Sequence, residues 1–402
     1  MSSDRQAWPA VTYEALPWVR RLEPGMASRT QIRRHAGPYR AAVLPEIARM
    51  PVSLPPEVAA DAEQASLEIS RFDAEMGGEI APFGAVLLRS ESAASSQIEN
   101  LTASARAIAE AELRGSGRRN ADQIVANVRA MDAAVALSER LDGDAILAMH
   151  RALMSHTHPT IAGRWREEQV WIGGTSLGPH AATFVPPHHD RVQPGIADLV
   201  AFMRRDELPV LVQAAVSHAQ FETIHPFPDG NGRTGRALLH ALLRNKSLTR
   251  NVTVPVSAGL LVDTEGYVAA LEAYRRGDLA PIVDRMASAA FAAVVNGRAL
   301  VADLREIHAA WHRQIRVRSD SAVWRLADLL VRHPVVDSAF IAERLQIAPR
   351  NVYRYVEVLV TAGVLSEFTD RARNRAWRAP EILDALDAFA TRAGRRAAVS
   401  GA

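Results

Sequence analysis

The chain contains the stretch His225-Pro226-Phe227-Pro228-Asp229-Gly230-Asn231-Gly232-Arg233-Thr234-Gly235-Arg236, which decides how the rest of it is interpreted. Residues 210–224 before it and residues 234–243 after it carry apolar side chains at helical spacing. The twelve residues therefore predict a turn between two helices, with the glycines placed where the second helix begins.

The residue types in this turn favour phosphate binding. A Gly-Asn-Gly sequence at a helix start presents unpaired N–H groups and the positive end of the helix dipole, which together attract anions. Gly230 and Gly232 let the backbone approach a ligand closely because they have no Cβ. Arg233 and Arg236 lie on one helix face and offer two-pronged donors to further phosphates. We therefore expect a polyphosphate at this turn.

Two other residues of the stretch supply chemistry. Asp229 offers hard oxygen ligands beside those phosphates, which suits Mg²⁺. His225 titrates near neutrality and accepts a proton from a hydroxyl group. Taken singly, each feature has an ordinary structural explanation: a core histidine, a tight turn, or a solvated arginine face. Their combination in this order predicts a metal-assisted nucleotide site with a base.

The stretch matches in full the H-x-F-x-[DE]-G-N-G-R-x-x-R signature of the Fic family, which the chain resembles from about residue 54 to about residue 284. The segment 218–222, His-Ala-Gln-Phe-Glu, is also typical of that family. The resemblance implies protein adenylylation, the transfer of AMP from ATP to a Ser, Thr or Tyr hydroxyl of a target protein. It assigns His225 as the base and Asp229 as the Mg²⁺ ligand. The nucleotide-binding residues that it implies are Gly230, Asn231, Gly232, Arg233, Thr234, Gly235 and Arg236, with Arg236 at the γ-phosphate.

The segment Ser95-Ser96-Gln97-Ile98-Glu99-Asn100 ends a predicted helix, since Asn tolerates the left-handed conformation that closes helices. By itself it leaves Glu99 as a surface carboxylate. It also resembles the family's inhibitory motif, [ST]-x-x-x-E-[GN], carried here by Ser95, Glu99 and Asn100. The resemblance implies a Glu99–Arg236 ion pair that places the carboxylate at the nucleotide site and blocks the productive pose of ATP.

Two further parts of the site come from weaker patterns. Residues 169–174 and 182–187 are strand-like and predict a hairpin. In the family a flap at this place aligns the target protein by strand-like pairing, so we expect the target to dock on residues 170–187. Tyr267 and Val268, in the predicted helix 264–276, fall where the family lines the adenine pocket.

The C-terminal part resembles a winged helix-turn-helix domain. Residues 321–332, 338–345 and 349–362 predict three helices, and residues 363–378 predict a hairpin with a basic run. On the third helix the apolar residues Val352, Val356 and Leu359 face the core. Its outward residues, Arg350, Asn351 and Arg354, are the candidate DNA-binding residues. Glu357, Glu367 and Asp370 dilute the positive charge, so protein docking or a homodimer is the alternative.

Composition bounds the remaining possibilities. The chain has 402 residues, no cysteine and a formal net charge of +2. It therefore has no disulfide and no thiolate metal site, and any basic surface is local. The histidines at 156, 158, 180, 188 and 189 match no zinc spacing, and we expect no metal site among them. With no signal-peptide pattern and no apolar run judged long enough to cross a bilayer, we expect a cytoplasmic protein.

These inferences combine into one architecture. We expect a mainly helical chain with a Fic core, one β-hairpin flap and a C-terminal winged helix. The expected segments are a helical arm with an inhibitory helix (1–110), the core (111–310), the winged helix (311–392) and a disordered tail (393–402), with residues 1–55 irregular. Three functional alternatives stay open: a DNA-binding regulator that uses the core as a nucleotide sensor, a Fic enzyme that removes AMP, or one that uses another nucleotide donor.

Overall fold

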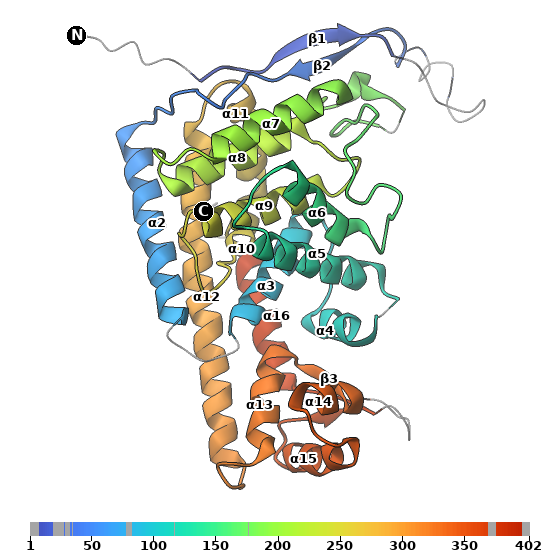
Figure 1. Ribbon diagram of the computed structural model, residues 1–402, viewed down its shortest axis with the longest axis vertical. Helices are drawn as coiled ribbons and strands as arrows, with labels where there is room; N and C mark the ends of the chain where they lie inside the picture. Colours follow the sequence, from blue (N-terminus) through green and yellow to red (C-terminus); the bar gives the residue numbers. More distant parts are fainter. Residues whose placement is uncertain are drawn as a thin grey trace. The chain divides into compact units, whose positions relative to one another are not determined.

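Helices form most of the regular structure in the computed structural model, as the apolar periodicity predicts (Figure 1). The structure describes residues 8–18, 28, 33, 35–77, 83–115, 117–175, 177–368 and 375–395. The chain divides into two compact units. Three of the boundaries fall within the helices α2 (Pro56–Gly77), α5 (Arg119–Ala136) and α12 (Ala280–Gln314), and the other two follow residues 246 and 264. Unit 1 comprises residues 1–63, 133–246 and 265–286, and unit 2 comprises the rest.

Unit 1 is built around two neighbouring helices, α8 (Val210–Ile224) and α9 (Asn231–Asn245). Every residue of α8 after Val210 is buried, so this helix is enclosed on all sides. Unit 1 also contains the helices α6 (Gly143–Met154), α7 (Val192–Met203) and α11 (Thr264–Arg275), with Thr264 just outside its boundary, and parts of α2, α5 and α12. Helix α7 contacts α8, and α6 contacts α9, so the turn between α8 and α9 is held from both sides (Figure 1).

The expectation of an irregular arm over residues 1–55 is wrong, because this segment contains two paired strands. Strand β1 (Thr12–Leu16) runs antiparallel to β2 (Tyr39–Val43), with Thr12 opposite Val43 and Leu16 opposite Tyr39. The prolines and arginines hid these short strands, whose partners lie far apart in the sequence. A small apolar cluster of Tyr39, Ala41 and Val185, with Trp18 and Trp171 packed against it, joins the strand pair to the predicted flap.

The predicted flap is paired, but by two isolated bridges rather than by two full strands. Ile172 pairs antiparallel with Phe184, and Thr175 pairs with Gly178. Gly173 and Gly174 both have φ of +75°, outside the strand region, and this interrupts the ladder. The short helices η1 (Pro179–Ala181) and η2 (His189–Arg191) complete this segment. It is fixed to the N-terminal strands by a hydrogen bond from the Ala42 N–H to the Val185 carbonyl.

Unit 2 contains the predicted inhibitory helix as α3 (Phe83–Ile98), which ends as expected with Asn100 at φ +61°. A helix that was not singled out from the sequence, α4 (Ala105–Arg114), follows it. Helix α3 contacts α10 (Val256–Leu260), where the buried Glu91 carboxylate accepts from the Ser257 N–H at 2.8 Å. The 3₁₀-helix η3 (Leu261–Asp263) follows α10.

The winged-helix order of the C-terminal part is confirmed. It comprises α13 (Ala322–Arg332), β3 (Val335–Asp337), α14 (Ser338–Leu345), α15 (Pro349–Thr361), β4 (Ser366–Glu367) and β5 (Ala376–Arg378). The strands form one sheet in the order β3-β5-β4. A further helix, α16 (Pro380–Arg395), was not predicted, and it includes the first residues of the expected disordered tail. The rest of that tail, and residues 369–374 of the basic run, lie outside the described residues.

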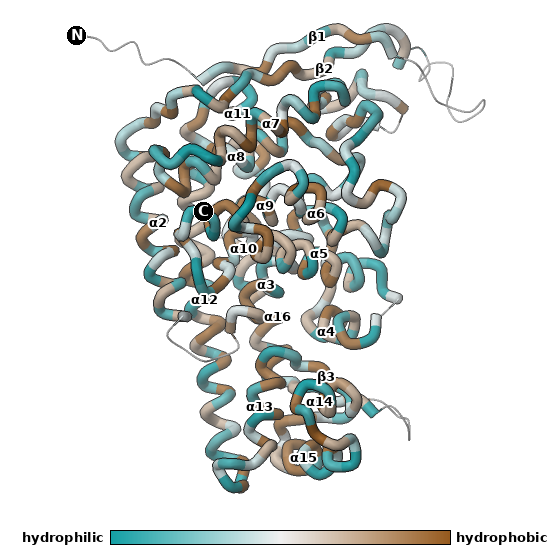
Figure 2. The backbone as a smooth tube through the Cα atoms, in the orientation of Figure 1, coloured by the Kyte–Doolittle hydropathy of each residue, from teal (hydrophilic) through white to brown (hydrophobic). Residues whose placement is uncertain are grey.

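Helix α12 corrects the expectation about apolar length. It has 35 residues, and an 18-residue window of it has a mean hydropathy of 1.3, which is long and apolar enough to cross a membrane. However, 56% of that window is buried, as in the core helix of a soluble protein, and polar bands interrupt the apolar ones along α12 (Figure 2).

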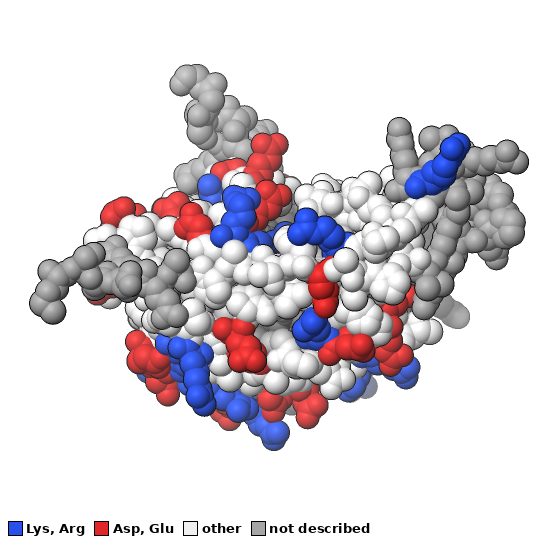
Figure 3. Space-filling model, turned by 90° about the horizontal axis from the view of Figure 1, so that it is seen from above, with Lys and Arg blue, Asp and Glu red and all other residues white. Residues whose placement is uncertain are grey.

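On the face drawn in Figure 3, acidic and basic side chains are interspersed, in keeping with the small net charge.

Candidate functional site

The segment between α8 and α9 is a turn joining two helices, as the sequence predicts, and a residue in the left-handed conformation stands at each end of it. His225 closes α8 at φ +49°, and its N–H donates to the Phe221 carbonyl at 2.9 Å. Gly230 stands before α9 at φ +77° with no side-chain cap. Helix α9 starts at Asn231, three residues before the predicted start, so the glycines 232 and 235 lie inside it. The first N–H groups of α9 therefore face the turn without a capping side chain.

Asn231 fastens this turn from within. Its Oδ1 accepts from the Phe227 N–H at 2.9 Å, and its Nδ2 donates to the Phe227 carbonyl at 2.8 Å. Both ends of the amide are thus engaged with one residue's backbone, and the side chain is buried. Asn231 acts in this structure as the residue that keeps the turn in shape.

The Phe227 ring lies in an aromatic stack that holds the turn from one side. It lies 3.7 Å from the His150 ring at an interplanar angle of 6°, and 5.1 Å from the Trp165 ring. The His150 Nδ1 accepts from the Gly163 N–H at 3.0 Å, so its Nε2 carries the proton and donates to the Asp229 carbonyl, also at 3.0 Å. Burial lowers the pKa of His150 to about 4, in keeping with this neutral form. His150 therefore holds the turn in place as a buried structural residue.

Two glycines of the stretch 225–236 are required by their surroundings. A Cβ on Gly230 would combine a positive φ with contacts of 3.0 Å to the Leu153 Cδ2 and 3.2 Å to the Met154 Sδ. A Cβ on Gly235 would lie 2.8 Å from the Phe221 ring, so Gly235 permits the close approach of α8 and α9. Gly235 thus allows the two helices to pack closely, whereas Gly230 shapes the start of α9.

Arg166 is a component of the site that was not recognised from the sequence. Its Nε donates to the His225 carbonyl at 2.8 Å, and its Nη2 donates to the Pro187 carbonyl at the base of the flap. Its Nη1 donates to the Glu168 carbonyl, and its own N–H donates to the Pro226 carbonyl. Burial lowers the pKa of Arg166 to about 10, which still leaves it charged at neutral pH. One buried guanidinium therefore ties the flap to the turn that carries His225.

The His225 imidazole is set up as a neutral group. Its Nδ1 is buried without a hydrogen-bond partner among the described residues, and it lies 4.0 Å from the Glu222 Oε2. Burial first, and then the positive fields of Arg166 and Arg275, lower the pKa of His225 to about 3. A neutral imidazole with an unengaged nitrogen is the form that accepts a proton.

The charged residues of the stretch differ in exposure. The Asp229 side chain is 53% exposed, and its Oδ1 accepts from the Gly230 N–H at 2.6 Å. The Arg233 Nη2 lies 3.7 Å from the same oxygen. Arg233, Thr234 and Arg236 are buried along α9. An exposed carboxylate thus stands at the start of a helix whose next turn carries buried guanidinium groups.

The two candidate adenine-pocket residues behave differently. The Tyr267 hydroxyl and the His218 Nε2 are 2.7 Å apart, and Tyr267 is buried, so it is part of the core of unit 1. Burial first, and then the field of Arg236, lower the pKa of His218 to about 3. Val268 is 51% exposed, so its side chain is accessible to a ligand.

A second guanidinium beside the site was also not expected. The Arg275 Cζ lies 3.8 Å from the centroid of the Phe184 ring in the flap, and burial lowers the pKa of Arg275. Its carbonyl accepts from the Val11 N–H at 2.8 Å, so the end of α11 also holds the N-terminal segment. Neither Arg166 nor Arg275 belongs to a recognisable motif, because each acts through backbone carbonyls or an aromatic face.

The remaining predicted residues lie in unit 2. Ser95 and Ser96 are fully buried, and the Asn127 Nδ2 donates to the Ser92 carbonyl at 2.9 Å and to the Ser96 Oγ at 3.2 Å. This fixes the end of α3 that carries Glu99. Arg236 belongs to unit 1, and the predicted ion pair between Glu99 and Arg236 stays a prediction.

On α15 the predicted faces are confirmed. Val352, Val356 and Leu359 are buried, Arg350 and Arg354 are exposed, and Asn351 is half-buried. The Arg354 Nη2 donates to the Tyr355 hydroxyl at 3.0 Å. Beside this helix, the Arg375 guanidinium pairs with Glu367 and lies 5.7 Å from the Tyr353 ring.

Comparison with known proteins separates the part of the chain that carries the turn 225–236 from the C-terminal part that carries α15. Residues 140–243 match the family model described as "Fic/DOC family", and residues 324–378 match the one described as "HTH DNA binding domain". The first match includes the whole turn 225–236, and the second includes α15.

Relatives and a solved structure point the same way. The chain is 32% identical over 143 residues to "Protein adenylyltransferase fic-1" of Caenorhabditis elegans, which is 35% of this chain and 25% of that protein. It is 30% identical over 149 residues to "Protein adenylyltransferase Fic" of Nematostella vectensis, which is 36% of this chain and 31% of that protein. The structure of a Fic family protein from Desulfovibrio desulfuricans G20 is similar with a TM-score of 0.52 at 22% identity, covering 82% of this chain and 98% of that one. This last likeness concerns the fold alone, and the chain spans no more than a third of the length of either named relative.

Proposed function

We propose that this chain, which carries a Fic domain followed by a C-terminal helix-turn-helix domain, is a protein adenylyltransferase. The observation that supports this most is the convergence of three groups at one turn. These groups are the neutral imidazole of His225, the exposed carboxylate of Asp229 and the uncapped start of α9. A helix start of this kind binds phosphate, and the buried Arg233 and Arg236 add charge-assisted donors.

In the proposed reaction a Ser, Thr or Tyr hydroxyl of the target attacks the α-phosphorus of ATP. A new oxygen–phosphorus bond forms while the bond to the pyrophosphate breaks, and the hydroxyl proton moves to the imidazole of His225. Burial lowers the pKa of His225, and a bound triphosphate would raise that pKa again because its negative charge favours the protonated imidazole. Transfers of this kind depend mainly on positioning and electrostatics, which the backbone amides of residues 230–232 would supply.

The residues present also fit the Mg²⁺ ion that this chemistry implies. Asp229 offers a hard oxygen ligand that is more than half exposed at the start of α9. When bound there, the ion would neutralise charge on the phosphates. The neighbouring Asn231 side chain is engaged with Phe227. We therefore assign Asn231 to shaping the turn, and Gly230 and Gly232 to direct phosphate contact.

We also propose that Glu99 restrains this activity by pairing with Arg236. The support is local: the end of α3 is held by Asn127, and Asn100 takes the left-handed conformation of a helix end. A carboxylate held rigidly competes with a phosphate for a guanidinium better than a mobile one, because it loses less conformational entropy. We expect the substitution Glu99→Gly to raise the rate of AMP transfer.

The target protein would dock on the flap. Phe184 and Ile172 pair across it, and Arg166 connects its base to the turn that carries His225. A docked segment would therefore be aligned with the same turn that carries the base. Recognition through main-chain pairing makes few demands on target side chains, so target identity is not encoded in the flap sequence.

The match of residues 324–378 favours a second role, DNA binding by α15. Arg350 and Arg354 are exposed on that helix, where guanidinium groups contact phosphates and base edges. A protein partner or a second copy of the chain at the same helix is the alternative. We also propose that the protein acts in the cytoplasm. A chain without cysteine forms no disulfide, so it needs no oxidising compartment to fold.

One experiment tests the enzymatic proposal and its alternatives. The wild-type chain, Glu99→Gly and His225→Ala are incubated with each labelled nucleoside triphosphate, alone and in cell lysate. We expect label from ATP on the chain or on a lysate protein, more of it with Glu99→Gly and none with His225→Ala. Labelling that persists in His225→Ala would remove His225 from its role. If no donor labels protein in any variant, while DNA binding responds to nucleotide, the chain is a sensor.

A further inference from the structure

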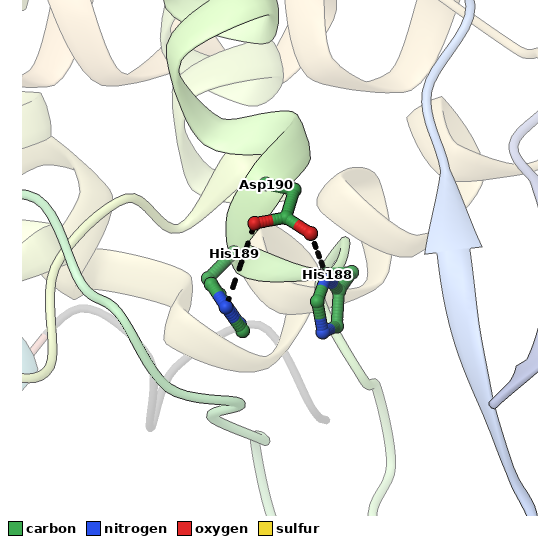
Figure 4. A group of neighbouring side chains, drawn as sticks. All are labelled: His188, His189 and Asp190. Carbon is green, nitrogen blue, oxygen red and sulfur yellow. Dashed lines mark ion pairs between the residues drawn. The ribbon is translucent and has the colours of Figure 1, made fainter. Parts of the chain in front are cut away.

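Three consecutive residues at the junction between the flap and α7 bring metal-ligating atoms together. The His188 Nδ1 lies 3.1 Å from one carboxylate oxygen of Asp190, and the His189 Nε2 lies 3.5 Å from the other (Figure 4). One ligand atom from each of the three residues lies within 4.8 Å of the others. Figure 4 shows both imidazole rings on the same side of the chain, directed toward the Asp190 carboxylate.

These separations suit a single transition-metal ion. Nitrogen and carboxylate ligands lie about 2.0–2.2 Å from Zn²⁺, and in a tetrahedral arrangement such ligands are about 3.3–3.6 Å from one another. The two imidazole nitrogens lie 3.1 and 3.5 Å from different oxygens of Asp190, and all three ligand atoms lie within 4.8 Å of one another, so the three side chains would draw closer together around an ion. Two imidazoles and one carboxylate leave one position for water.

The backbone on both sides of the group is already fixed. The Pro187 carbonyl accepts from the buried Arg166, and the Arg191 N–H donates to the His188 carbonyl at 2.9 Å. The Arg191 side chain makes a two-pronged ion pair with Glu14 on β1, at 2.8 and 3.0 Å. Ligands held by a fixed backbone lose less entropy when an ion binds, which favours affinity.

The exposure of the three side chains provides an entry path. The Asp190 side chain is 78% exposed, whereas those of His188 and His189 are about one-third exposed. An ion would approach from solvent through the carboxylate and come to lie against the half-buried imidazoles.

We propose that His188, His189 and Asp190 form a binding site for a divalent transition metal such as Zn²⁺, separate from the Asp229 site. Nitrogen ligands favour Zn²⁺, Ni²⁺ or Cu²⁺ over Mg²⁺, so the ion required for phosphate chemistry does not compete for this group. The sequence predicted no metal site at these histidines, because their spacings match no zinc pattern and the chain has no cysteine. Here the ligands are adjacent in the sequence, and the 3₁₀ turn η2 brings the second and third side chains beside the first.

The consequence of binding would be a stiffer base of the flap. The ion would hold three consecutive residues directly after Pro187, whose carbonyl Arg166 links to the turn of His225. Amide exchange in residues 177–187 is therefore expected to slow when the ion binds. This readout needs neither ATP nor a target protein, so its result is independent of the proposed transferase activity.

The test is a titration of the tag-free chain with Zn²⁺ by calorimetry, with Co²⁺ absorption as a second probe. We expect one ion per chain, at least about a tenfold loss of affinity in each of His188→Ala, His189→Ala and Asp190→Asn, and slower amide exchange in the flap of the wild type only. His156→Ala, at an exposed histidine outside the group, is the matched control and should bind as the wild type does.

Three results would overturn the proposal. Absence of Zn²⁺ and Co²⁺ binding by the wild type would refute it. So would affinities of the three site variants within a few-fold of the wild type, or an equal loss in His156→Ala. Circular dichroism of each variant establishes that it is folded before the titration is interpreted.

Discussion

Replacing Gly230 with alanine isolates the contribution of the turn geometry. Gly230 has φ +77°, immediately before the first residue of α9. An alanine there must either adopt a left-handed conformation or rotate the backbone that aims the first N–H groups of α9. We therefore expect Gly230→Ala to lower both the free energy of unfolding and the affinity for ATP.

The magnitude follows from two terms. A left-handed conformation costs a residue with a Cβ about 1–2 kcal/mol. The added methyl would also lie 3.0 Å from the Leu153 Cδ2 and 3.2 Å from the Met154 Sδ. Forcing an extra methyl into a packed site costs about 1–3 kcal/mol. The sum is about 2–5 kcal/mol, unless the turn relaxes and sacrifices the phosphate site instead.

The assay compares this variant with Gly37→Ala in the same unit. Gly37 also has a positive φ, +91°, but no atom lies within 4 Å of the position that an added methyl group would take. Gly37→Ala should therefore show the backbone cost of about 1–2 kcal/mol alone. Urea unfolding followed by circular dichroism measures both variants, and calorimetry measures their ATP affinity in the Glu99→Gly background.

Two outcomes would refute this reasoning. If Gly230→Ala unfolds at the same urea concentration as Gly37→Ala, the contacts with Leu153 and Met154 do not limit the turn. If Gly230→Ala also binds ATP as tightly as its parent, the left-handed turn is not needed for the phosphate site.

The remaining predictions concern protonation, a buried hydrogen bond and the winged helix. Burial lowers the pKa of His150 to about 4 and of His225 to about 3, so the folded chain binds fewer protons than the unfolded chain below pH 6.5. The free energy of unfolding should therefore be at its full value above about pH 6.5 and fall as the pH drops toward 4. This fall should be less steep in His150→Gln than in the wild type. Urea unfolding at several pH values measures both, and equal slopes for the two proteins would contradict the prediction. Tyr267→Phe leaves the buried His218 Nε2 without its partner and should cost about 1–3 kcal/mol in urea unfolding, whereas no change would mean that water replaces the hydroxyl. Arg354→Ala should weaken DNA binding and reduce the slope of log affinity against log salt by about one in a fluorescence anisotropy titration; an unchanged slope would favour a protein partner at α15.

The amino-acid sequence by itself determined the local features of this protein. The ends of α14 and the faces of α15 follow from apolar periodicity, because a helix satisfies its backbone hydrogen bonds within a few residues. The turn 225–236 could be predicted as a phosphate site because the residues that favour phosphate are concentrated in twelve consecutive positions.

Only the tertiary structure decided features that depend on distant partners. Strands β1 and β2 pair across a long intervening segment, and Arg166 donates to carbonyl groups, which every residue has and no sequence pattern marks. The engagement of Asn231 with Phe227, and the meeting of His188, His189 and Asp190 around one point, likewise depend on the detailed course of the backbone. Side-chain types establish which chemistry is available, but hydrogen bonds to the main chain and the directions of side chains arise only when the chain has folded.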